Sequence, residues 1–151
     1  MQTIRFLYNN AYLIENQILC GTRGWFLDEK QQVTVGSVDY ERIVNREVIR
    51  LKLSLDNAIM LQKEAFERSG VLSPVSVFLH FPPVWLDFVC RPLVDTLHEY
   101  GDPACYFGHI HGMYNAPRDV VFEGIPLHLI SSDALDFNLH RLPDVVITGN
   151  Q

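Results

Sequence analysis

The sequence predicts a mixed α/β fold for the single domain that spans residues 1–151. Its 48% hydrophobic and 20% charged residues are typical of a globular chain that buries a core. The apolar runs at 75–79 and 104–107 have the length of buried strands. By contrast, 40–68 contains no proline or glycine and repeats its apolar residues at helical spacing. Strands and helices are therefore expected to share one core.

The first 30 residues are predicted to form two or three short strands, at 3–7, 11–14 and 17–21. Turn residues separate them, with Asn9-Asn10 after the first strand and Glu15-Asn16-Gln17 after the second, which favours hairpin connections. The glycines of 21–25 then break the strand pattern, so we expect a loop.

One long amphipathic helix is predicted over 40–68. Its apolar stripe consists of Val44, Val48, Leu51, Leu55, Ala58, Leu61 and Ala65. Ser69-Gly70 ends the helix, because glycine readily adopts the left-handed conformation that closes helices.

A buried strand at 75–79 and a loop at 81–83 follow the long helix. A shorter helix is expected from Trp85 to Tyr100, kinked or interrupted by Pro92, whose ring cannot continue a regular helix.

The last part of the sequence predicts more strands. They are 104–107, then 120–122 and 126–130 around a turn at Gly124, with 145–147 as a candidate final strand. The tail after Ser131 is otherwise expected to be loop.

Composition excludes several classes of function. The net charge of −6 and the isoelectric point near 5.4 argue against a nucleic-acid-binding surface, which needs clustered lysine and arginine. Cys20, Cys90 and Cys105 form no even disulfide set, which favours buried thiols in a reducing compartment. The sequence has neither a signal-peptide pattern nor an apolar run long enough to span a membrane, so a cytoplasmic location is expected.

Three histidines stand at the ends of predicted strands. His80 follows 75–79, and Gly108-His109-Ile110-His111 follows 104–107. Imidazole suits Zn, Mn, Fe, Co or Ni, so His80, His109 and His111 are candidate metal ligands rather than ordinary strand-end polar residues. The other histidines, His98, His128 and His140, are expected to have structural or solvent-exposed roles.

These segments resemble a known family. His80-Phe81-Pro82-Pro83 followed by Gly108-His109-Ile110-His111 is similar to the last two metal motifs of calcineurin-like metallophosphoesterases. The segments 20–25 and 129–133 are similar to those of a bacterial branch of predicted phosphohydrolases within that superfamily. The resemblance implies a two-sheet β-sandwich flanked by helices, of which this chain would be the carboxyl-terminal half, and therefore a partial domain.

The same resemblance implies a dinuclear site. His80 and His109 would bind one divalent ion and His111 the other, with Gly108 letting the backbone turn closely beside the pair. The complete domain would hold two ions, of Mn, Fe or Zn. The family's Asp-x-His, Gly-Asp and Gly-Asn-His-Asp motifs are missing from this sequence. Because three neutral imidazoles add no negative charge between two cations, this chain alone is expected to hold at most one ion weakly.

The loop at 21–25 adds a candidate substrate ligand. The Arg23 guanidinium could clamp a substrate phosphate with two hydrogen bonds, but an arginine between glycines is equally consistent with a turn.

The leading hypothesis is half of a phosphoesterase that hydrolyses a phosphomonoester or phosphodiester, carried on a small molecule or a phosphoprotein. No catalytic residue is assigned within this chain, which would be inactive until an amino-terminal half or a second copy completes it. One alternative is an inactive remnant or interaction module, and another is a protein with a mononuclear three-histidine site. No nucleic-acid or membrane partner is expected.

Overall fold

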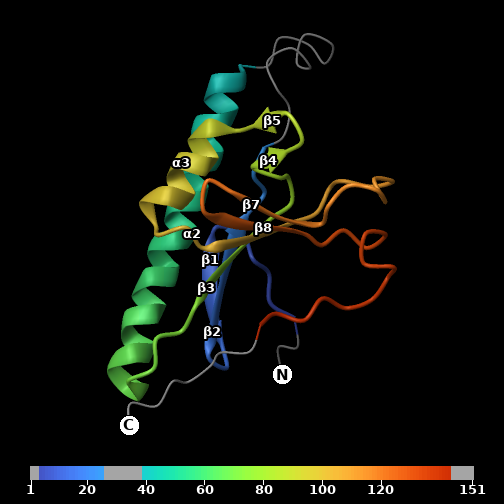
Figure 1. Cartoon of the computed structure of the whole chain (residues 1–151). Helices are drawn as coiled ribbons and strands as arrows, with labels where there is room; N and C mark the ends of the chain where they lie inside the picture. The colour runs from blue at the N-terminus through green and yellow to red at the C-terminus, as the bar shows by residue number, and fades with distance from the viewer. Residues whose placement is uncertain (1–3, 26–38, 144–151) are drawn as a thin grey trace.

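The computed structural model describes residues 4–25 and 39–143 (Figure 1). The described residues form a six-stranded sheet, a two-stranded sheet and two helices, which confirms the mixed α/β class. The larger sheet has the spatial order β1 (Asn10–Ile14), β2 (Gln17–Thr22), β3 (Val75–Leu79), β6 (Ala104–Phe107), β8 (Ile125–Leu129), β7 (Asp119–Phe122). The smaller sheet pairs β4 (Val84–Trp85) with β5 (Phe88–Val89), and the helices are α2 (Tyr40–Ser69) and α3 (Arg91–Glu99).

The four central strands of the larger sheet are parallel. β2, β3, β6 and β8 run in one direction, whereas β1 and β7 are antiparallel to their neighbours. The last residues of the parallel strands are paired in one row, which consists of Thr22, Leu79, Phe107 and Leu129. The segments that follow these strands therefore leave the sheet at the same edge.

Both helices lie on one face of the sheet (Figure 1). Alternate strand residues such as Val77, Cys105 and Leu127 form one hydrophobic core with the buried side chains of α2 and α3. The helices are also joined directly, because Lys52 Nζ lies 2.6 Å from Glu99 Oε2. The three cysteines are buried and free, as expected from the sequence.

The opposite face of the sheet carries a row of aromatic rings. Phe78, Tyr106 and His128 are paired across β3, β6 and β8, and their rings stack at centroid distances of 5.0 and 4.7 Å. The ring of His140, from the carboxyl-terminal segment, lies 5.5 Å from Tyr106. This segment thus covers part of a face that neither helix contacts.

The long helix has the predicted extent. Asp39 accepts a hydrogen bond from the Arg42 N–H at its start, and Gly70, with φ of 70°, donates to the Phe66 carbonyl at its end.

A buried hydroxyl ties α2 to the first hairpin. Ser54 Oγ accepts from the Gly21 N–H at 2.7 Å and donates to the Asn10 carbonyl at 2.6 Å. Gly21 is needed here, because a Cβ at this position would lie 1.9 Å from the Phe78 carbonyl oxygen. One serine therefore satisfies backbone groups of two strands that the core covers.

Two predicted elements are wrong. Residues 4–7 form no strand, since Tyr8 N–H donates to the Asn10 side chain and the apolar side chains of this segment, such as Phe6 at 76% exposed, are not buried. The helix predicted from Trp85 begins only at Arg91, because 84–89 form the β4–β5 hairpin. Pro92 lies in the first turn, where its missing N–H has no helical partner to lose. The candidate strand at 145–147 lies outside the described residues.

We expect Ser54→Ala to lower the free energy of unfolding by about 1–3 kcal/mol, because it leaves the buried Gly21 N–H without an acceptor. Urea denaturation measures the loss. Ser132→Ala, at an exposed serine, is the matched control and should change stability by less than about 0.5 kcal/mol. Equal losses in the two variants would contradict this role of Ser54.

Candidate metal centre

The sequence-predicted site residues gather at the edge where the parallel strands end. Arg23 follows β2, His80 follows β3, and His109 and His111 follow β6. Asp133 follows β8 at the same edge. Crevices outside the carboxyl ends of parallel strands are common ligand sites in such folds, since loops from adjacent strands converge there.

Backbone hydrogen bonds hold the first two segments together beyond the sheet. The N–H groups of His80 and Phe81 both donate to the Arg23 carbonyl, at 3.1 and 2.9 Å. Gly24, with φ of 69°, lies so close to this segment that a Cβ would be 3.0 Å from the Phe81 carbonyl oxygen. The approach of the two loops therefore depends on a glycine at 24.

His109 occupies the centre of a very tight turn. The Ile110 N–H donates to the Gly108 carbonyl at 2.8 Å, and His109 between them has φ of 67°. A bond from residue i+2 to residue i around a positive φ is the strained form of the γ-turn. The resemblance implied that Gly108 lets the backbone turn closely here, but the residue with positive φ is His109. A Cβ at Gly108 would meet the His80 carbonyl oxygen at 3.9 Å, an ordinary contact.

This turn brings His109 against His80. Their ring centroids are 5.2 Å apart, and the ring planes are inclined by 71°. A metal–nitrogen bond of about 2.0–2.1 Å places an ion about 3 Å from each ring centre. The separation of the two rings is therefore compatible with both binding one ion.

Phe81 is the hub of the side-chain cluster. Its ring lies 4.6 Å from that of His80, 4.5 Å from that of His109 and 5.8 Å from that of Trp25. The Arg23 guanidinium lies 5.2 Å from the Phe81 ring and 5.6 Å from the Trp25 ring. Arg23 is thus exposed beside the two histidines and stacked on aromatic rings, and among residues 4–25 and 39–143 it has no carboxylate in salt-bridge contact.

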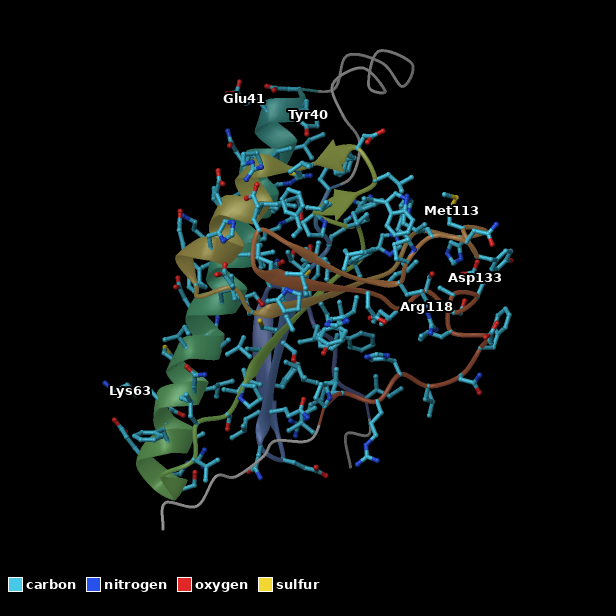
Figure 2. All side chains as sticks on the ribbon, in the orientation of Figure 1. Tyr40, Glu41, Lys63, Met113, Arg118 and Asp133 are labelled. Carbon is cyan, nitrogen blue, oxygen red and sulfur yellow. The ribbon has the colours of Figure 1, made fainter. Side chains whose placement is uncertain are left out.

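His111 has a different environment. Its Nδ1 lies 2.8 Å from Asp133 Oδ1, and the Gly112 N–H donates to Asp133 Oδ2 at 2.8 Å. The His111 side chain is 61% exposed, whereas that of Asp133 is only 15% exposed. Figure 2 labels Asp133 among the loops at this side of the molecule, with Arg118 and Met113 close by.

The electrostatics follow from these contacts. Burial lowers the pKa of His109, and the neighbouring His80 and His111 lower it further. The Gly112 N–H, followed by His111, lowers the pKa of Asp133 to about 2. The edge therefore favours a neutral His109 and, next to His111, an ionised Asp133 at neutral pH; a neutral imidazole is the form that binds metal.

The described residues bring imidazoles together at this edge. His80 and His109 offer two imidazoles to one ion, and His111 offers a third with a carboxylate behind it. Within residues 4–25 and 39–143, no group of three His, Cys, Asp or Glu side chains has the arrangement of a complete site. The remaining histidines lie elsewhere, with His98 paired to Asp102 and His128 paired to Asp119.

Sequence reasoning missed Phe81 and Asp133 as parts of this site. Asp133 could have been found from its place, since it follows the fourth parallel strand as the histidines follow the second and third. Nothing in the sequence distinguished Phe81 from an ordinary loop residue. Its importance lies in contacts with Trp25 and Arg23, which are 56 residues or more away in the sequence.

Comparison with known proteins gives no further guide, because no family model, no curated protein and no solved structure matches the chain. Of the helices formed by 39–143, neither has the length and apolar character needed to cross a bilayer.

We expect His98 and His109 to titrate on opposite sides of the ordinary histidine pKa of about 6.5. The hydrogen bond to Asp102 raises the pKa of His98, whereas burial lowers that of His109. His98 therefore stabilises the fold below about pH 6.5 and loses this contribution as pH rises through its folded pKa. The contribution of His109 to stability is present above about pH 6.5 and is lost as pH falls through its lowered folded pKa.

Ring proton chemical shifts of the metal-free protein, followed against pH, measure both values. His80→Gln should raise the pKa of His109, because it removes a neighbouring positive charge, and should leave His98 unchanged. The reverse order of the two pKa values would contradict the environments that the structure gives to His98 and His109.

Proposed function

We propose that this chain carries the histidine-rich half of a dinuclear metal site in a phosphoesterase that hydrolyses a phosphomonoester or phosphodiester. The observation that carries the proposal is the meeting of His80, His109, His111 and Arg23 at the carboxyl edge of β2, β3 and β6. A site for phosphate chemistry needs imidazoles for metal and a cation for the phosphate oxygens, and this edge offers both.

Each residue has a proposed role. His80 and His109 would hold one divalent ion between their rings, and His111 would hold the second. Arg23, held against Trp25 and Phe81, would bind a phosphate oxygen of the substrate through its guanidinium edge. The bound ions, of Mn, Fe or Zn, would supply Lewis-acid activation and a hydroxide nucleophile.

The site needs carboxylates from another segment. Two divalent ions about 3.5–4 Å apart require a bridging negative charge, and the three histidines provide none. We propose that an amino-terminal half, in the same polypeptide or another chain, or a second copy supplies these ligands. By itself this chain would hold at most one ion weakly and would be inactive.

The architecture of the complete domain is part of the same proposal. The larger sheet would be one layer of a two-sheet sandwich, with α2 and α3 outside it. The aromatic row of Phe78, Tyr106 and His128 would face the second layer. A phosphorylated small molecule or phosphoprotein in the cytoplasm is the proposed substrate.

Titration of the full chain with Mn²⁺ tests the proposal. The electron paramagnetic resonance signal of the free ion measures how much Mn²⁺ is bound. We expect no more than one weak site, with affinity lowered at least tenfold in His80→Ala and in His109→Ala. His140→Ala, at an exposed histidine outside this edge, is the matched control and should bind as the wild type does.

Equal binding by all four proteins would contradict a site at this edge. No binding by the wild type would favour the alternative, an interaction module that keeps the fold without the chemistry. Hydrolysis of bis-p-nitrophenyl phosphate should appear only when a polypeptide with the Asp-x-His, Gly-Asp and Gly-Asn-His-Asp motifs is supplied, and should fall in Arg23→Ala without loss of metal.

A further inference from the structure

A single aspartate joins the last two loops of the candidate metal centre. Asp133 uses Oδ1 for His111 Nδ1 and Oδ2 for the Gly112 N–H, each at 2.8 Å. Both carboxylate oxygens are thus engaged by two consecutive residues of the loop after β6. This arrangement fixes the ring and the backbone next to it together.

The segment that carries Asp133 is itself held in place. Ser131, two residues earlier, is buried and donates from Oγ to the Ile110 carbonyl at 2.6 Å. On the other side, the Asp136 N–H donates to the Asp133 carbonyl at 3.2 Å. The loops after β6 and β8 are therefore joined at Ile110, His111 and Gly112, which leaves Asp133 little freedom to turn away.

The chemistry of the pair selects one form of the imidazole. An ionised carboxylate only accepts hydrogen bonds, so the nitrogen that faces it must carry the proton. His111 Nδ1 is consequently the protonated nitrogen in the neutral ring, and Nε2 keeps its lone pair. Metal-binding histidines commonly donate their second ring N–H to a carboxylate in this way, and loss of such a partner lowers metal affinity about 10–100-fold.

We propose that Asp133 is a positioning residue for the metal centre, which fixes His111 in the Nδ1–H tautomer and directs its Nε2 lone pair to the second ion. This role rests on the proposed function, since it presupposes an ion at His111. The Asp133 carboxylate also gives the histidine half of the site a negative charge of its own, hydrogen-bonded to the proposed ligand His111.

The chain contains a matched control for this pair. His128 Nδ1 lies 2.7 Å from Asp119 Oδ1, which is nearly the same geometry, but this pair is on β8 and β7 and outside the candidate site. Asp119 is 67% exposed, against 15% for Asp133. Asp119→Asn therefore removes an equivalent carboxylate without touching the metal centre.

The first experiment determines the tautomer of His111 in the metal-free chain, from the ring nitrogen chemical shifts followed to alkaline pH until they no longer change. The wild type should show Nδ1–H. In Asp133→Asn the amide oxygen can still accept from Gly112, but the amide N–H would face His111 Nδ1 and favour the Nε2–H form. Asp119→Asn should leave His111 unchanged. A wild-type ring in the Nε2–H form, or no change in Asp133→Asn, would overturn the proposal.

The second experiment compares Mn²⁺ affinity among the same proteins. Because His111 is assigned to the second ion, this comparison uses the chain together with the polypeptide that supplies the missing motifs. We expect Asp133→Asn to weaken binding of the second Mn²⁺ about 10–100-fold, Asp133→Glu to restore part of it and Asp119→Asn to have no effect. Wild-type affinity in Asp133→Asn would overturn the role of Asp133 and leave the proposed function standing. No binding by the wild type would overturn both, even where the tautomer is as expected.

Discussion

The register of four parallel strands is the constraint on which the candidate site depends. Because Thr22, Leu79, Phe107 and Leu129 end β2, β3, β6 and β8 in one row, the next residues of each strand leave the sheet side by side. A shift of one residue in any strand would turn its buried side chains to the opposite face, so the core that α2 and α3 cover fixes the register. The packing of the helices thus determines which loop residues meet at the edge.

Much of the fold could be predicted from the sequence, because hydrophobic periodicity is strong where burial is strong. The helix α2 and the strands β3 and β6 have the expected extents, since one apolar stripe of the helix and alternate side chains of the strands belong to the core. The segments 4–7 and 84–89 are apolar too, but their conformation depends on local turns and on tertiary contacts. Phe6 is exposed. Trp85 lies in a hairpin rather than a helix, and its ring centroid is 6.1 Å from that of Phe107.

The histidines of the site could be found as strand-end residues, but their partners could not be ranked. Seven aspartates follow Trp85 in the sequence, and only the ladder of strands distinguishes Asp133 from the others. Arg23 stands over the Trp25 ring, and Phe81 meets that ring edge-on, so both rings support the guanidinium. The edge therefore brings a guanidinium and imidazoles together in a chain whose net charge is −6.

The turn at His109 means that stability and ligand placement oppose each other in this chain. A residue with a side chain pays roughly 1 kcal/mol or more to hold a positive φ, a conformation that glycine adopts freely. A variant with glycine at 109 would thus relax the loop while it removes the imidazole that meets His80. Random screens for heat-resistant variants of this protein would select substitutions at this position. The selected variants would be more stable and would lack the histidine pair of the candidate site.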